Sequence, residues 1–215
     1  MLNKSKGNMY PWVTHTWNVV KGKCPHDCLY CYMKRHPQPE LHFDEKELKT
    51  DLGQGNTIFV GSSCDMWAVG VPMNWIQPVM EKCIENVYNR YLFQSKNPLR
   101  FAAYRFPDEV ILGTTIESNR HYPLISKASA PHRRMDALII LKGKKMVNIE
   151  PILEFDINTM LMMIKMIEPE FVSIGADSGN NHLPEPSGDK VKALISELEK
   201  ITQVKIKDNL GRLLK

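Results

Sequence analysis

Residues 16–32 read TWNVVKGKCPHDCLYCY. This stretch joins a short β-branched run, Thr16–Val20, to a loop that carries Cys24, Cys28 and Cys31. Three thiols spaced four and three residues apart on one short loop can point toward a single centre, and soft thiolates favour iron–sulfur clusters, zinc or Cu(I). The segment therefore predicts a strand that leads directly into a loop able to hold such a centre.

The order of a short strand followed by a helix recurs along the rest of the chain. Further strands are predicted at Thr57–Val60, Tyr91–Phe93, Glu109–Leu112, Lys145–Ile149, Phe171–Ile174 and Val204–Ile206. Helices are predicted at Asp44–Leu52, Asn74–Asn89, Arg133–Leu138, Asp156–Ile167 and Asp189–Ile201. Such alternation implies crossover connections and a largely parallel sheet. Since a complete eight-unit barrel needs about 250 residues, we expect an α/β fold, a partial (β/α)6-type parallel barrel over about residues 14–207, in one domain spanning residues 1–215.

Composition narrows the class of protein. The 215 residues are 43% hydrophobic and 24% charged, close to the average for soluble domains. No apolar run approaches the roughly 18 residues that a bilayer crossing needs, and no apolar segment follows the basic N-terminus, so we expect a cytoplasmic protein without membrane contact. A formal charge of +4 permits a polyanionic partner without requiring one. Five cysteines, an odd number, favour metal or thiol chemistry over a disulfide framework.

The number of loop cysteines leaves two kinds of metal site open. A closed structural zinc site has four ligands, so three cysteines would need His26 or His36 to complete it. A [4Fe–4S] cluster held by three cysteines instead keeps one iron free to bind another molecule. The second kind of site would be chemically reactive.

The spacing Cys24-x3-Cys28-x2-Cys31, with Tyr30 before the last cysteine, resembles the signature loop of the radical S-adenosylmethionine (SAM) enzymes. The resemblance implies a [4Fe–4S] cluster on these three cysteines and SAM bound at the free iron. It implies reductive cleavage of SAM to a 5′-deoxyadenosyl radical that abstracts hydrogen from a substrate. A one-electron donor such as flavodoxin or ferredoxin would be the partner. In this family Tyr30 would lie near the adenine of SAM, a position that also suits an aromatic residue packing the loop.

The same resemblance implies further contacts to SAM at the strand ends, where barrel enzymes keep their active sites. The family usually has a Gly-Gly-Glu motif after the second strand, whereas this chain has Gly-Ser-Ser-Cys-Asp at positions 61–65. Candidate SAM-binding residues are Ser62, Ser63, Asp65, Thr115, Glu117 and Glu150. The alternative for Glu117 and Glu150 is a solvated or salt-bridged loop. Asp177 follows the next strand, but its Asp-Ser-Gly sequence is also ordinary turn chemistry.

Two segments resemble the spore photoproduct lyases, radical SAM enzymes that reverse a thymine dimer in DNA. These enzymes have a similar Cys-x-Tyr-Cys-Tyr end to the cluster loop, and a cysteine after the second strand that returns a hydrogen atom to the substrate radical. The matching residues here are 28–32 and 63–70. The resemblance implies that Cys64 is the hydrogen donor and that Tyr32 relays. The alternative is that Cys64 is a small buried thiol of the core, which is the expected role of Cys83.

Photoproduct lyases are longer than this chain, which more closely resembles a compact, phage-associated branch of radical SAM proteins. The shared segments are Tyr-Cys-Tyr at 30–32, Ser95–Pro98, Gly-Thr-Thr-Ile-Glu at 113–117 and Ile-Glu-Pro-Ile-Leu at 149–153. A nucleic-acid base or nucleotide is the favoured substrate, with a peptide or small metabolite as alternatives. A different class of function also stays open: a non-catalytic zinc or iron–sulfur module that binds nucleic acid or a protein partner.

Overall fold

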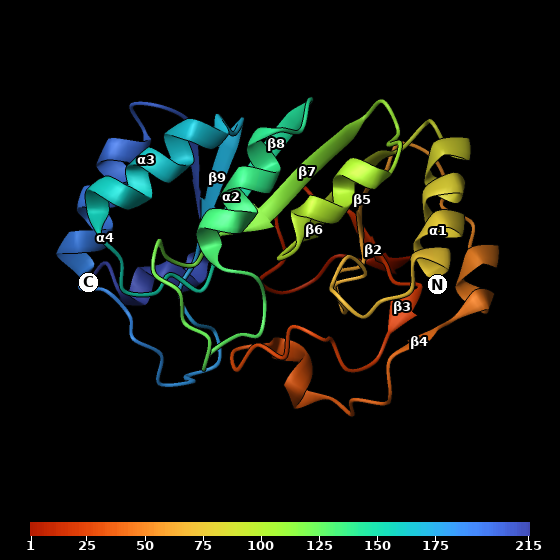
Figure 1. Ribbon diagram of the computed structural model, residues 1–215, viewed down its shortest axis with the longest axis horizontal. Helices are drawn as coiled ribbons and strands as arrows, with labels where there is room; N and C mark the ends of the chain where they lie inside the picture. Colours follow the sequence, from red (N-terminus) through yellow and green to blue (C-terminus); the bar gives the residue numbers. More distant parts are fainter.

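An eight-stranded sheet forms the centre of the computed structural model, which describes residues 1–215 (Figure 1). In spatial order its strands are β1 (Asn3–Lys4), β2 (His15–Trp17), β5 (Thr57–Val60), β6 (Arg90–Ser95), β7 (Val110–Thr115), β8 (Lys144–Ile149), β9 (Phe171–Ile174) and β10 (Gln203–Ile206). Every pair from β2 to β10 is parallel, and only β1 is antiparallel to its neighbour. Since β1 and β10 are edges, the sheet does not close. These observations confirm the predicted α/β class with a mostly parallel sheet.

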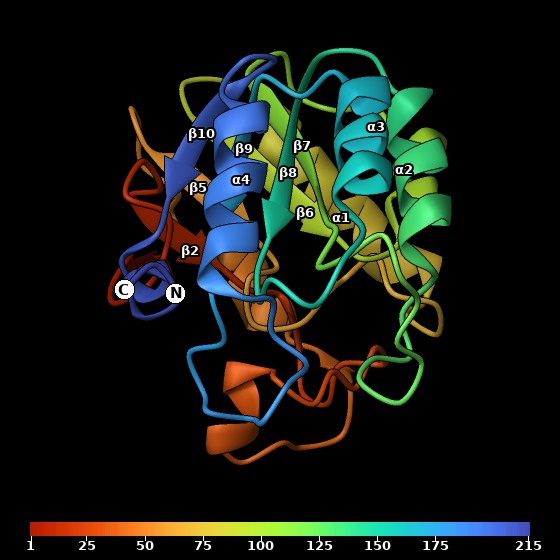
Figure 2. The same ribbon diagram turned by 90° about the vertical axis from the view of Figure 1, so that its left-hand side faces the viewer.

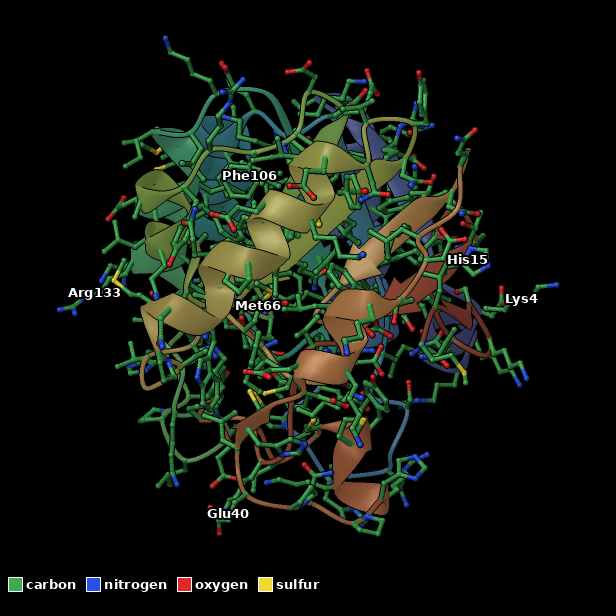
Figure 3. The ribbon with its side chains drawn as sticks, turned by 90° about the vertical axis from the view of Figure 1, so that its right-hand side faces the viewer. Lys4, His15, Glu40, Met66, Phe106 and Arg133 are labelled. Carbon is green, nitrogen blue, oxygen red and sulfur yellow. The ribbon has the colours of Figure 1, made fainter.

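Helices cover one face of this sheet (Figures 1 and 2). They are α1 (Met73–Glu85), α2 (Pro131–Ile139), α3 (Ile157–Ile167) and α4 (Gly188–Leu198), while the β6–β7 crossover uses the 3-10 helix η3 (Pro98–Ala103). Figure 3 shows α1 lying across the strands. Each helix buries a stripe of apolar residues, and alternate strand residues such as Ile58 and Val60 meet these stripes in one cluster of 38 buried residues. None of the helices has the length and hydropathy that spanning a membrane requires.

On the other, concave face of the sheet, side chains fill the part near the amino-terminal ends of the strands. There Leu92, Ile111, Met146 and Phe171, all early in their strands, form a second cluster with Tyr10 and Val13. The Tyr10 ring stacks on Trp12 at 5.4 Å, and Trp12 meets Phe171 edge-on. This aromatic plug closes the amino-terminal end of the concave face. The large cavity on this face lies instead at the carboxyl ends of the strands.

Three predicted elements differ most from the structure in extent. The predicted helix Asn74–Asn89 already ends at Glu85 of α1. The predicted strand Thr16–Val20 is split, because β2 ends at Trp17 and β3 (Val20–Lys21) pairs with β4 (His42–Phe43) in a separate two-stranded sheet. The predicted helix Asp44–Leu52 is only a 3-10 helix, η2 (Glu45–Lys49). It ends early because the Asp51 side chain accepts a hydrogen bond from the Gly53 amide, a local turn that competes with a helix. Two further 3-10 helices are η1 (Tyr32–Arg35) and η4 (Asp208–Arg212).

Candidate functional site

A cavity of about 630 Å³ lies at the carboxyl ends of the strands. This volume is within the range of about 300–1,000 Å³ found for small-molecule and cofactor sites. The orange segment that carries η1 lies beyond the strand ends at this side (Figure 2). Eleven of the twelve residues singled out in the sequence line the cavity: Tyr30, Tyr32, Ser62, Ser63, Cys64, Asp65, Thr115, Glu150 and the three loop cysteines Cys24, Cys28 and Cys31.

The cysteine loop is fixed at both ends by backbone contacts. Gly22 has a φ of +95°, and a Cβ at this position would come within 2.7 Å of the Pro39 carbonyl oxygen, so only glycine fits without strain. Farther along, the Leu29 amide donates to the Ile125 carbonyl at 2.8 Å. The Cys28 thiol lies 3.1 Å from the Ser126 hydroxyl. The loop is thereby held against the segment between β7 and α2, which aims its thiols at the cavity.

Cys24 and Cys64 interact directly. The neighbouring Cys64 thiol lowers the pKa of Cys24, whereas Cys24 and burial raise the pKa of Cys64. A lowered pKa suits a metal ligand, because the thiolate is the form that binds metals. All five cysteines are free, and Cys83 is buried in α1, as expected for a core residue.

The Asp65 carboxylate lines the cavity but is already bonded to the protein. It accepts hydrogen bonds from His26 Nε2 at 2.8 Å, the Ser95 hydroxyl at 2.9 Å, and the amides of Lys96 at 2.8 Å and Trp67 at 3.0 Å. Burial alone would raise the pKa of Asp65, but His26 and these bonds outweigh it and lower the pKa. Asp65 therefore ties the loop after β5 to the end of β6.

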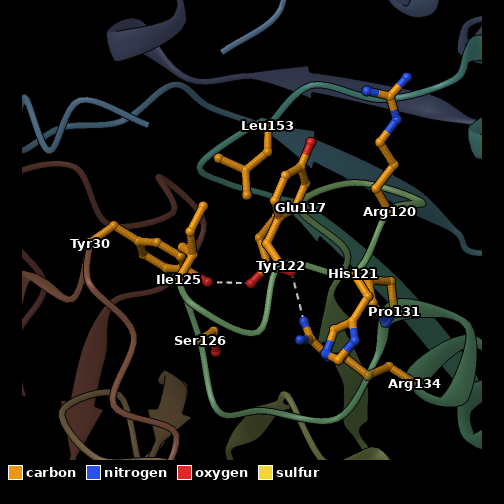
Figure 4. A pocket seen from close by; sticks show the side chains of 10 residues that line it. All are labelled: Tyr30, Glu117, Arg120, His121, Tyr122, Ile125, Ser126, Pro131, Arg134 and Leu153. Carbon is orange, nitrogen blue, oxygen red and sulfur yellow. Dashed lines mark hydrogen bonds and ion pairs between the residues drawn. The ribbon is translucent and has the colours of Figure 1, made fainter. Parts of the chain in front are cut away.

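Glu117 is the one predicted residue that does not line the cavity. It lies behind Tyr30, whose hydroxyl donates to it, and Arg134 Nη1 lies 2.7 Å from its carboxylate (Figure 4). Lys96 Nζ approaches it to 3.4 Å. Burial would raise the pKa of Glu117, but the charges of Arg134 and Lys96 and the bond from Tyr30 together lower it to about 2. This buried network joins the cysteine loop, the end of β6 and α2.

Glu150 lines the cavity as part of a salt bridge. Its carboxylate accepts from Lys207 Nζ at 2.7 Å, Asn8 Nδ2 at 2.7 Å and Asn209 Nδ2 at 3.0 Å. This pairing matches the salt-bridged alternative considered for Glu150. The bond from Asn8 also draws the N-terminal segment over the cavity.

Several lining residues could not be recognised in the sequence. Lys96 follows β6 by one residue, and a strand prediction extended past Phe93 would have placed it at the strand end. Asn148 belongs to β8 and faces the cavity. The rim carries Lys4, Lys6 and Arg35, for which no acidic partner within salt-bridge distance is found. Lys4 extends from the edge of the molecule into solvent (Figure 3). No local pattern marks these rim residues, because tertiary structure alone brings them together.

The unclosed, mostly parallel sheet with helices on one face resembles the fold of a radical SAM enzyme. Solved structures of spore photoproduct lyase share this fold. Its complex with dinucleoside spore photoproduct matches with a TM-score of 0.59 and 11% identity over 91% of this chain. A cysteine-to-alanine variant with the same dinucleoside matches with a TM-score of 0.61 and 12% identity. A double variant with bound AdoMet, another abbreviation for SAM, matches with a TM-score of 0.59 and 11% identity.

This similarity is one of fold. The chain spans less than two thirds of the length of spore photoproduct lyase, covering 63–64% of those chains. No family profile matches the sequence, and no curated protein matches it.

Proposed function

We propose that this protein is a radical SAM enzyme in which Cys24, Cys28 and Cys31 hold a [4Fe–4S] cluster. The observation that carries the proposal is that all three cysteines line one large cavity, together with the polar strand ends. When bound, the cluster supplies the electron that cleaves SAM to a 5′-deoxyadenosyl radical, which takes hydrogen from a substrate. The protein's part is to bind both molecules and to exclude water from the space between them.

The residues present suit a cluster better than a structural zinc ion. A closed zinc site would need His26 as a fourth ligand beside the three cysteines. Three cysteines alone are enough to hold a cluster that keeps one iron open. An open cavity beside the cysteines also favours a reactive centre over a closed structural one.

The cavity contains groups suited to each part of SAM. Lys96 offers an ammonium for the carboxylate; burial would lower the pKa of Lys96, but the charge of Glu117 raises it and keeps the group cationic. Ser62 and Thr115 offer hydroxyls from two strand ends. Tyr30, beside the last cysteine, is placed to contact the adenine.

Replacing Lys96 with Met should weaken SAM binding. The substitution keeps the length of the side chain and removes the one charge we assign to the SAM carboxylate, a charge-assisted contact worth about 1.5–3 kcal/mol, or roughly 10- to 150-fold in Kd. Equilibrium binding of SAM to the reconstituted protein measures the effect. Lys144, half exposed on β8 and far from the cavity, provides the control: Lys144→Met should bind SAM normally. Equal affinities in the wild type and Lys96→Met would refute this role.

We further propose that the substrate is a nucleic-acid base or nucleotide. The support is the rim of unpaired cations, Lys4, Lys6 and Arg35, which suits phosphate groups. The structural neighbours with bound dinucleoside spore photoproduct act as a precedent in the same fold. A one-electron donor such as flavodoxin or ferredoxin would complete the reaction.

We propose that Cys64 returns hydrogen to the substrate radical. Its thiol lines the cavity, and the hydroxyl of Tyr32, bonded to the Ser62 carbonyl at 3.1 Å, lines the same space and could relay. Cys64→Ala should leave iron content and 5′-deoxyadenosine formation unchanged, because Cys64 is not a cluster ligand in this proposal. It should alter product distribution or deuterium return, measured by mass spectrometry. Loss of iron or of SAM binding in this variant would contradict the donor role.

Anaerobic reconstitution with iron and sulfide tests the proposed function as a whole. A brown protein that converts SAM to 5′-deoxyadenosine on reduction would support it. A colourless zinc protein that is inert toward SAM would reject it in favour of a non-catalytic metal module.

A further inference from the structure

One buried polar atom in the cavity wall has no partner in the protein. Four such side-chain atoms exist, and they belong to Trp12, Trp67, Asn148 and Asn209. Of these residues, only Asn148 lines the cavity. Asn148 is 5% exposed, and its Oδ1 accepts no hydrogen bond. Since about nine in ten buried polar groups in proteins are paired, this exception marks Oδ1 as an acceptor that is free to bond a molecule in the cavity.

The neighbours of Asn148 define which atoms are free to meet that ligand. Thr115 on β7 is its register partner and lines the same cavity. The Thr115 hydroxyl accepts from Gln94 Nε2 at 3.1 Å, which leaves its own proton available. Gln94 Oε1 is in turn occupied by the Tyr10 hydroxyl at 2.7 Å. The free set is therefore a carboxamide, with an acceptor and a donor side by side, next to one hydroxyl donor.

The carboxylate nearest to this set in the sequence is already neutralised. Glu150, two residues farther along the chain, pairs with Lys207 and also accepts from Asn8, so a cation would find no free charge there. A ligand group with acceptors alone could use the two donors but would leave Asn148 Oδ1 unpaired. The complementary group is a neutral, planar edge with a donor next to an acceptor, such as nucleobases carry and asparagine pairs with in two hydrogen bonds.

We infer that Asn148, with Thr115 beside it, is the specificity-determining contact for a nucleobase. The inference rests on the proposed function, which supplies two ligands that carry a base. These are SAM, through its adenine, and a nucleotide substrate. Both present the same edge chemistry, and binding experiments separate them.

The test is Asn148→Leu, which removes both hydrogen-bonding groups at similar volume. Binding of SAM and of the four deoxynucleoside 5′-monophosphates is measured on the full-length, anaerobically reconstituted protein. About tenfold weaker binding of SAM would assign the site to adenine. About tenfold weaker binding of a nucleotide, with SAM binding unchanged, would assign it to the substrate base. Unchanged binding of all five probes, or no binding of any of them by the wild type, would overturn the inference.

Thermal unfolding without ligand supplies a second readout and a matched control. Asn89 is equally buried, but its carboxamide bonds the Asn56 amide at 3.0 Å and the Gly53 carbonyl at 2.8 Å. Asn89→Leu should therefore lower Tm and spare ligand binding, whereas Asn148→Leu should keep Tm and lose binding. An equal fall in Tm for both variants would show that Asn148 is structural and overturn the inference. Should Asn148→Leu not fold, Asn148→Ser replaces it in both measurements.

The outcome is independent of the cluster. A wild type that assembles no cluster, yet binds a nucleotide in an Asn148-dependent way, would refute the proposed function and support the nucleobase site. If the wild type cleaves SAM and Asn148→Leu binds every probe as well as the wild type, the proposed function is supported and the nucleobase site is refuted.

Discussion

Cys28→Ala should contain no more than background iron after anaerobic reconstitution. Cys28 is buried in the cysteine loop, and its loss leaves two of the three sulfur ligands that we propose for the cluster. Two thiolates cannot hold a cluster that has an iron open to SAM. Iron and sulfide analysis, with the absorption spectrum, measures the effect.

Cys83→Ala is the matched control, because Cys83 is a fully buried thiol in α1 that does not line the cavity. It should lose some stability through a small internal void, yet assemble the same amount of cluster as the wild type. Iron in Cys28→Ala at the level of Cys83→Ala would remove the basis of the proposed function.

Glu117→Ala should destabilise the fold by about 3–5 kcal/mol, the usual cost of leaving buried charges without their partner. Arg134 is 3% exposed and Lys96 is largely buried, so both cations would lose the carboxylate that balances them. Urea unfolding at pH 7 measures the change. Glu109→Ala is the control, since its carboxylate is half exposed and pairs only loosely with Arg90 and Lys144. We expect it to cost less than about 1 kcal/mol; equal losses in the two variants would contradict the structural role of Glu117.

Glu117 also predicts how stability changes with acid. The pKa of Glu117 is about 2 in the folded protein and near 4.5 when unfolded. Its contribution to stability is therefore complete above about pH 4.5 and is lost as the pH falls from there toward 2. Glu117→Gln should lack this part of the acid dependence in urea titrations at several pH values. An identical acid profile in both proteins would show that Glu117 is not the group responsible.

Most of the sheet could be predicted because its strands carry local signals. The predicted strands at residues 57–60 and 171–174 match β5, which is buried on alternate residues, and β9, which is buried throughout. The division of the first strand could not be predicted, because it depends on a distant contact: the Asn18 side chain bonds the Ser63 amide at 2.9 Å and turns the chain away from β2. No helix is predicted between β6 and β7, where the structure has the 3-10 helix η3.

The candidate site follows the same division between local and distant information. Three cysteines within eight residues are a clear local signal of a site. Polar residues at strand ends can be assigned to the same site once the fold class is predicted. Glu117 looked like one of these, but Arg134, 17 residues later on α2, draws it behind Tyr30 and out of the cavity. Asn148 carried no signal, because an asparagine inside a strand becomes informative only when its bonding partners, or their absence, are known.

The aromatic plug of Tyr10, Trp12 and Phe171 fills the space at the amino-terminal ends of the strands, and Tyr10 also lines the cavity above it. A ligand bound against Asn148 and one bound beside the cysteine loop would therefore share this one cavity. Under the proposed function, a radical formed from one of them would have the other as its neighbour.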